Sequence, residues 1–215
     1  MSGSLVSVNV GTPREADWAE IGRTSISKHS VAGPVQVGPL GLDGDRVSDR
    51  RHHGGIDQAV YAFAREDLDW WAGELGQDVP DGQFGENLTT RGIDVNEAEV
   101  GERWQVGTAT FEIAMVRIPC NDFKNWQSRN GYDDTRWVRR FTEQARPGPY
   151  LRVVQEGELQ AGDDLTVVHQ PGHGVTVSTL FRAMTTERSL LPELLRVDGL
   201  AREPRRKAEQ YVGLA

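Results

Sequence analysis

Apolar and polar residues alternate in several short stretches of the chain, most clearly over residues 5–10, 102–106, 109–118, 150–155 and 164–169. This alternation is typical of half-buried β-strands, whose successive side chains point to opposite faces. Residues 24–37 read as two more short strands with a break at Gly33-Pro34, and the apolar residues 59–63 read as a buried segment. Glycines stand at the corners between these stretches. The pattern predicts a mainly β fold, with an antiparallel sheet curled into a barrel.

Helical periodicity appears in a few short segments. In residues 65–75, Leu68, Trp71 and Leu75 share one face and acidic residues come first, which predicts an amphipathic helix. Trp70 and Trp71 are adjacent, so we expect one to face inward and one outward. Two short peripheral helices are predicted over residues 121–129 and 134–144.

After residue 170 the sequence changes from strand-like to helical patterns. Ser178 is expected to cap a helix through Met184, Pro192 to open a second helix through residue 196, and Pro204 to open a third through residue 211. We therefore predict a β-barrel domain over residues 1–170 and a small C-terminal three-helix extension over residues 171–215.

Charge and composition exclude several classes of protein. The 215 residues carry a net charge of −8, from 24 basic and 32 acidic side chains, which disfavours general nucleic-acid binding. The sequence contains neither a basic leader nor a long apolar run, so a cytoplasmic protein without a membrane span is expected. The single cysteine excludes an intramolecular disulfide, a multi-cysteine zinc site and a four-cysteine iron–sulfur cluster.

The stretch over residues 41–61 concentrates four glycines, three arginines and two adjacent histidines between apolar segments. Glycine allows close backbone approach, and arginine offers planar donors suited to phosphate and carboxylate groups. The composition therefore points to a lining for an anionic ligand, although on composition alone a solvated polar hairpin explains it too.

Cys120 is the second candidate for chemistry. Arg117 and Pro119 precede it, and a predicted helix follows, with Asn121 or Asp122 as its expected cap. A thiol at a helix N-terminus near arginine favours its thiolate form, which acts as a nucleophile, a persulfide carrier or a ligand of a soft metal. Because the chain offers no second thiol, metal ligation or group transfer is favoured over disulfide exchange. A small buried side chain is the alternative.

Other polar residues have both a structural and a functional interpretation. His53 precedes Gly54-Gly55 and is expected in a pocket, whereas His52 is expected to be structural. Asn87, within FGENLTT, suits a turn cap as well as a ligand pocket. Asp45 and Asp57 are expected to cap turns or to orient basic side chains.

In their order along the chain, these motifs resemble the MOSC family, the molybdenum cofactor sulfurase C-terminal domain proteins. The resemblance is closest to the stand-alone bacterial branch that ends in a three-helix extension. The segments that carry it are TSISKHSVAGPV, GLDGDRVSDRRHHGGIDQAVYAF, FGENLTTRGI and VGERWQVGTATFEIAMVRIPC. The family implies a MOSC-type β-barrel with peripheral short helices.

The resemblance also implies a cofactor and a set of residues that bind it. The cofactor would be the molybdenum cofactor, a molybdopterin with molybdenum, and Cys120 would be the catalytic metal ligand. The residues implied at the cofactor pocket are Thr24, Ser25, Lys28, Arg46, His53, Gly54, Gly55, Asn87 and Arg117. A pyridoxal phosphate site is not expected.

The activity implied by the resemblance is reduction of N-hydroxylated compounds, such as hydroxylamines, amidoximes and N-hydroxylated bases. Electrons would then come from a partner reductase that carries a flavin or an iron–sulfur centre. Two alternatives stay open: a sulfur carrier with a Cys120 persulfide, and a cofactor-binding module without turnover. Asn121-Asp122 follows the cysteine where the family often has an aromatic residue, which leaves the substrate preference open. The oligomeric state is open too, a homodimer included.

Overall fold

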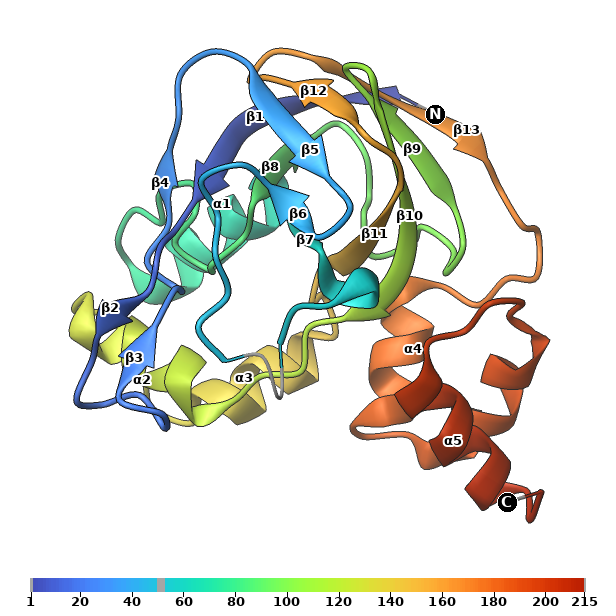
Figure 1. Ribbon diagram of the computed structural model, residues 1–215. Coiled ribbons are helices and arrows are strands. Elements are labelled where there is room, and N and C mark those ends of the chain that lie inside the picture. The colour runs from blue at the N-terminus through green and yellow to red at the C-terminus, as the bar shows by residue number, and fades with distance from the viewer. Residues whose placement is uncertain (1, 50–52, 215) are drawn as a thin grey trace.

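A seven-stranded barrel forms the centre of the structure. The computed structural model describes residues 2–49 and 53–214, so Arg50, Arg51 and His52 lie outside the described residues. Within these parts the strands follow the order β1-β8-β7-β11-β10-β9-β13, and β13 pairs back with β1 to close the barrel (Figure 1). The barrel strands are β1 Ser2–Val10, β7 Val60–Ala64, β8 Leu88–Arg91, β9 Arg103–Val106, β10 Ala109–Val116, β11 Pro149–Gln155 and β13 Asp164–His169. The predicted mainly β barrel is confirmed.

Short strands extend the barrel at its edges. β4 (His29–Ser30) pairs with β1, and β5 (Val35–Gly38) pairs with both β6 (Gly41–Leu42) and β12 (Gly157–Leu159). β2 (Arg14–Glu15) and β3 (Arg23–Thr24) form a separate two-stranded ribbon. The expected break at Gly33-Pro34 falls between β4 and β5.

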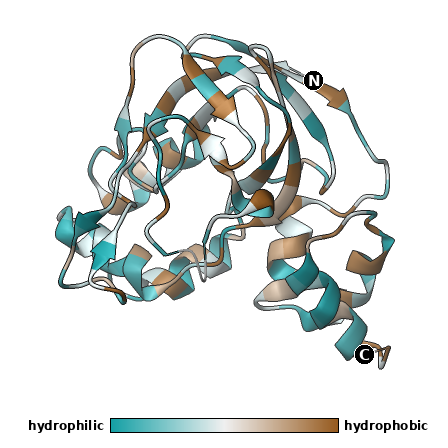
Figure 2. Ribbon diagram, viewed as in Figure 1, coloured by the Kyte–Doolittle hydropathy of each residue, from teal (hydrophilic) through white to brown (hydrophobic). Residues whose placement is uncertain are grey.

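Alternation sets the register of the central hairpin. Along β10, Phe111 and Ile113 are buried while Thr110 and Glu112 are half-buried, and the same alternation of hydrophobic and hydrophilic residues is visible along barrel strands in Figure 2. Gly107 turns β9 into β10 with a φ of 57°, and a Cβ there would meet the Glu158 carbonyl oxygen. This turn therefore requires glycine. The strand ends at Val116 rather than at residue 118.

Helices cover one side of the barrel. α1 (Arg65–Leu75) has the predicted bounds and connects the parallel pair β7 and β8. α2 (Asn121–Arg129) also begins where predicted, but its N-cap is Cys120, and neither Asn121 nor Asp122 caps it. α3 ends at Gln144, as predicted, but it begins at Trp137 and not at residue 134. The start is late because Arg136 takes a left-handed φ of 52°, which breaks helical geometry.

Aromatic rings join these helices to the barrel. Between ring centroids, Phe63 of β7 lies 5.1 Å from Phe84, and Phe84 lies 5.3 Å from Phe123 of α2. Trp71 of α1 lies 4.8 Å from Trp137 of α3. Trp71 is 1% exposed and its neighbour Trp70 is 42% exposed, as the adjacent pair predicted. Aromatic contacts at these distances add to the burial energy of each ring. The helices are therefore fixed against the barrel end that holds the cavity described below.

The C-terminal segment forms three short helical elements beside the barrel, coloured orange to red in Figure 1: α4 (Val177–Met184), η2 (Arg188–Arg196) and α5 (Arg202–Tyr211). Thr176, not Ser178, caps α4 by accepting a hydrogen bond from the Thr179 N–H, whereas the Ser178 hydroxyl donates to Ala145. Pro192 lies inside η2 instead of opening it, which the 3₁₀ geometry tolerates.

Apolar residues of the C-terminal elements, Phe181 and Leu194 among them, belong to the same core cluster as the barrel residues. The division into two domains at residue 170 stays a prediction. No helix within residues 2–49 and 53–214 is both long enough and apolar enough to cross a membrane.

Asn87 ties three strands together at the end of the barrel. Its carboxamide oxygen accepts from the Tyr61 N–H at 3.1 Å, and its amide nitrogen donates to the Asn9 carbonyl at 3.1 Å. All three residues are buried. The side chain therefore joins β7 and β1 to the start of β8, where a turn cap was the structural expectation.

We expect Asn87→Ala to lower the free energy of unfolding by about 3 kcal/mol, because two buried backbone groups lose their partners. Urea denaturation followed by circular dichroism measures this change. Asn130→Ala, at the exposed end of α2, is the matched control and should cost less than about 1 kcal/mol. Equal effects of the two substitutions would contradict the role assigned to Asn87.

Candidate functional site

A cavity opens at the end of the barrel next to α2, and we call it the inner cavity. Its walls come from the stretch over residues 23–28, from residues within 45–49 and 53–59, and from residues at or next to the ends of β7, β8, β10 and β11. The lining residues used below are Thr24, Ser25, Lys28, Asp45, Arg46, Ser48, Asp49, His53, Gly54, Gln58, Tyr61, Gly85, Asn87, Arg117, Cys120, Asp122 and Tyr150. Described residues of the predicted stretch, within 45–49 and 53–61, thus line a cavity, whereas Gly41–Leu42 form a hairpin strand with β5.

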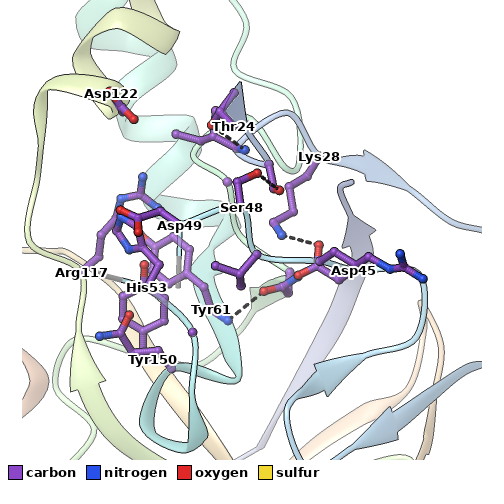
Figure 3. Close-up of a pocket in the computed structure, with 18 of the residues that line it drawn as sticks. Thr24, Lys28, Asp45, Ser48, Asp49, His53, Tyr61, Arg117, Asp122 and Tyr150 are labelled. Carbon is purple, nitrogen blue, oxygen red and sulfur yellow. Dashed lines mark hydrogen bonds and ion pairs between the residues drawn. The ribbon is translucent and has the colours of Figure 1, made fainter. Parts of the chain in front are cut away.

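Lys28 lies on one side of the inner cavity. Its ammonium group pairs with Asp45 at 2.5 Å, and the Asp45 carboxylate also accepts the Gly11 N–H at 2.7 Å (Figure 3). Burial lowers the pKa of Lys28 below its ordinary value, although the ion pair with Asp45 opposes this change. Asp45 therefore orients a basic side chain, as one of its two sequence interpretations predicted.

Arg117 lies on another side of the cavity, in Figure 3 near Asp49 and His53. Its guanidinium carbon lies 4.2 Å from the Phe123 ring centroid and 5.1 Å from that of Tyr61. Among the described residues no carboxylate forms an ion pair with it, and its buried Nε has no hydrogen-bond partner. Burial opposes its charge, but electrostatic contact with Tyr150, Tyr61 and other groups raises its pKa above the ordinary value. The cavity therefore contains a buried cation with an unused N–H donor.

Glu86 shapes the wall between these two cations. One carboxylate oxygen accepts the Gly82 N–H at 2.6 Å and the other accepts the Phe84 N–H at 3.0 Å. The turn that Glu86 holds brings Gly85 against Arg117, where an added Cβ would lie 3.5 Å from Nη1. Burial raises the pKa of Glu86 to about 7, although these hydrogen bonds oppose the shift.

Cys120 lies where the inner cavity meets a second depression, the outer cleft. The outer cleft is lined by Glu20, Asp49, His53, Gln58, Met115, Val116, Ile118, Pro119, Cys120, Asn121, Asp122, Val138, Tyr150, Met184, Glu203 and Lys207. Cys120 is half-buried, and as N-cap of α2 it lies at the positive end of that helix. Among the described residues no group of three or more His, Cys, Asp or Glu side chains is arranged to hold a metal ion.

The C-terminal elements supply part of the outer cleft. Met184 comes from α4, and Glu203 and Lys207 come from α5, where they form an ion pair at 3.2 Å. A molecule that approaches Cys120 from this side therefore passes residues of the C-terminal helical elements.

All of the residues predicted at the pocket except Gly55 line the inner cavity, and Gly55 instead precedes the 3₁₀ helix η1 (Ile56–Gln58). Their role in binding a ligand stays a prediction. Asn87 reaches the cavity with its carboxamide already engaged by backbone groups, and Arg46 is mostly exposed.

Several functional candidates were missed from the sequence. Tyr61, Tyr150, Gln58 and Glu86 were not singled out, and Asp122 was considered as a helix cap and not as a cavity residue. Gln58 and Tyr61 lie inside the stretch over residues 41–61, and Glu86 lies inside FGENLTT. The signal that could have identified these three residues was therefore their position inside a motif. For Tyr150 no local signal exists, since β11 brings it to Tyr61 from far along the chain, with ring centroids 5.0 Å apart.

The comparison with models of protein families identifies the family of this chain. The family model described as the MOSC domain matches residues 49–166, more than half of the chain. The chain belongs to the MOSC domain family. The matched range includes the HGG segment, the GENL segment and Cys120.

Individual relatives agree with this assignment. The protein YiiM of Escherichia coli is 31% identical over 164 residues, which is 75% of this MOSC chain and 71% of that protein. The crystal structure of YiiM from Geobacillus stearothermophilus has a TM-score of 0.80 at 24% identity, and the match covers 99% of this chain and 100% of that one. A protein of Gibberella moniliformis named "Reductase" is 25% identical over 199 residues, which is 89% of this chain but 34% of that longer protein.

The burial of Glu86 predicts a pH dependence of stability. Its pKa rises from an ordinary 4.5 to about 7 in the folded protein, so between these pH values the folded state holds a proton that the unfolded state has lost. The free energy of unfolding of the wild type should therefore fall by about 3 kcal/mol as the pH rises through this window, relative to Glu86→Gln.

Urea denaturation at a series of pH values measures this difference. The exposed Glu74→Gln is the matched control and should keep the wild-type profile. Parallel profiles for the wild type and Glu86→Gln would contradict the prediction.

Proposed function

We propose that this MOSC protein is a molybdenum-cofactor-dependent oxidoreductase that reduces N-hydroxylated compounds. The observation that carries the proposal is the position of its one thiol. Cys120 lies between a cavity with two buried cations and a cleft open to solvent. The MOSC assignment and the distant reductase relative support a role connected with molybdenum cofactor chemistry.

The residues of the inner cavity fit a pterin cofactor with a terminal phosphate. Arg117 offers a buried Nε–H without a partner, which suits an anionic ligand. Gly85 leaves space beside the cation and Gly54 leaves space beside Val47, and both take positive φ values, 77° and 78°. A thiolate is a suitable ligand for a soft metal that also carries sulfur ligands. Cys120 would therefore hold the metal, while Arg117 and Lys28 would hold the phosphate.

When bound, the cofactor supplies two electrons that, with two protons, convert N–OH into N–H and water. The chain's own residues bind and orient the reactants. Burial raises the pKa of Tyr150, so its hydroxyl stays protonated at neutral pH and is available as a hydrogen-bond donor at the mouth of the cavity. Asp122 lines both spaces, and its carboxylate accepts the Glu20 N–H, which holds the loop beside the mouth in place.

The electrons must come from outside this chain, since its single cysteine cannot hold a four-cysteine iron–sulfur relay. We propose a partner reductase with a flavin or an iron–sulfur centre. The substrate would reach Cys120 through the outer cleft, past α5.

Sulfur transfer is the second candidate, because Cys120 is half-exposed and a persulfide on it would be reachable from the outer cleft. Intact-protein mass spectrometry separates the two functions. A stoichiometric persulfide on Cys120 in protein without molybdenum or pterin favours the carrier. A protein that binds pterin tightly but reduces no N-hydroxylated compound with an artificial electron donor would instead be a binding module.

We expect wild-type protein from cells that make the cofactor to contain molybdenum and pterin in near-equal amounts. Cys120→Ala should lose most of the metal, about tenfold or more, because the thiolate ligand is gone. Elemental analysis and fluorescence of the oxidised pterin measure the two contents.

Asn121→Ala is the matched control, since this exposed neighbour of Cys120 is the first residue of α2. It should keep both metal and pterin. Thermal unfolding establishes that all three proteins are folded. Equal metal content in the wild type and Cys120→Ala would refute the role of Cys120, and no metal or pterin in any of them would favour sulfur transfer.

A further inference from the structure

Gln58 carries a buried acceptor that the protein itself leaves unused. Its Oε1 atom is shielded from solvent and has no hydrogen-bond partner. Buried side-chain polar atoms almost always have a partner, so an unpaired carbonyl oxygen inside a protein needs a physical explanation. Gln58 lines both the inner cavity and the outer cleft. The residue that carries this acceptor therefore lies at the passage between the two spaces.

The backbone that presents this carboxamide is held on both sides. Asp57, immediately before it, accepts two hydrogen bonds from the Arg152 guanidinium, at 3.0 and 2.6 Å. Arg152 is held in turn by Glu112 at 2.9 Å. Ala59, immediately after it, is buried. The acceptor is consequently preorganised on a short fixed helix, unlike a glutamine on a mobile surface loop.

The surroundings of Gln58 place it next to the chemistry. Cys120 and Tyr150 also line both spaces, so a molecule that enters through the outer cleft and reaches the thiol passes these three residues. Burial keeps the Tyr150 hydroxyl protonated by raising its pKa. Tyr150 and Gln58 therefore offer a hydrogen-bond donor and an acceptor to the same small molecule, in a passage that Asp49, His53 and Asp122 also line.

We propose that Gln58 Oε1 accepts a hydrogen bond from an N–H group of the substrate. The preferred substrates are then N-hydroxylated compounds with an N–H donor beside the N–OH group, such as amidoximes, over oximes in which carbon takes that place. A substrate without the donor leaves the buried acceptor unpaired and is selected against. The inference rests on the proposed reductase function and narrows its substrate class.

Two isosteric probes test this preference. Benzamidoxime carries an NH₂ group where acetophenone oxime carries a methyl group. Titration calorimetry without an electron donor, so that no turnover occurs, measures the binding of each probe to cofactor-loaded protein. We expect the wild type to bind benzamidoxime about tenfold more tightly, the size of one hydrogen bond.

Two variants of Gln58 assign that difference to the acceptor. Gln58→Met keeps the length of the side chain and removes the acceptor, so the two dissociation constants should become equal within about twofold. Gln58→Glu keeps an acceptor and should keep the preference. Gln160→Met, at an exposed glutamine far from the site, is the matched control and should behave as the wild type.

Each other outcome overturns the inference. Equal weakening of both probes by Gln58→Met would indicate a steric role. Loss of molybdenum or pterin in Gln58→Met would assign the acceptor to an N–H of the cofactor. A wild type that binds neither probe, or that binds both equally, would refute the preference outright.

Turnover with an artificial electron donor then separates this inference from the proposed function. Binding that depends on Gln58, with no reduction of either probe, would leave the inference standing and refute the reductase. Reduction of both probes with equal kcat/KM in the wild type would support the reductase and refute the inference about Gln58.

Discussion

Arg117 is a charge held in the interior without a carboxylate partner among the described residues, and the site is arranged around it. Burying a cation is costly unless other groups compensate for the lost hydration. The rings of Phe123 and Tyr61 provide part of this compensation, since cation–π contacts contribute up to about 2 kcal/mol when desolvated. The unpaired Nε leaves the compensation incomplete. An anionic ligand in the inner cavity would complete it.

The neighbouring groups keep this cation accessible from the cavity. Asp45 pairs with Lys28, so this cavity carboxylate neutralises the other cation and not Arg117. Glu86 directs its two oxygens to backbone N–H groups and holds Gly85 against the guanidinium. Arg117 is left at the cavity as a cation without an ion-pair partner among the described residues, in a protein whose overall charge is −8. Attraction of an anion is therefore local to the cavity.

Local patterns in the sequence predicted α1 and most of the barrel strands, but not β8 (Leu88–Arg91). They also indicated a ligand-lining role for the stretch over residues 41–61, although its composition alone favoured a solvated polar hairpin. These features follow from periodicity and composition, which act over a few neighbouring residues. The functional candidates that were missed depend on barrel closure. Glu86 is an ordinary polar residue in sequence, and its raised pKa follows from complete burial by segments distant along the chain. Tyr150 meets Tyr61 only because β11 pairs with β7. The late start of α3 reflects the left-handed backbone of Arg136, for which the sequence holds no signal.

Location of the metal tests the central claim most directly. Crystals of cofactor-loaded protein, measured with X-rays on both sides of the molybdenum absorption edge, give the metal position as an anomalous difference peak. We expect a single strong peak at the mouth of the inner cavity, within bonding distance of Cys120 Sγ, with pterin density extending toward Lys28 and Arg117. A molybdenum peak away from Cys120, in protein with a full complement of metal, would contradict it.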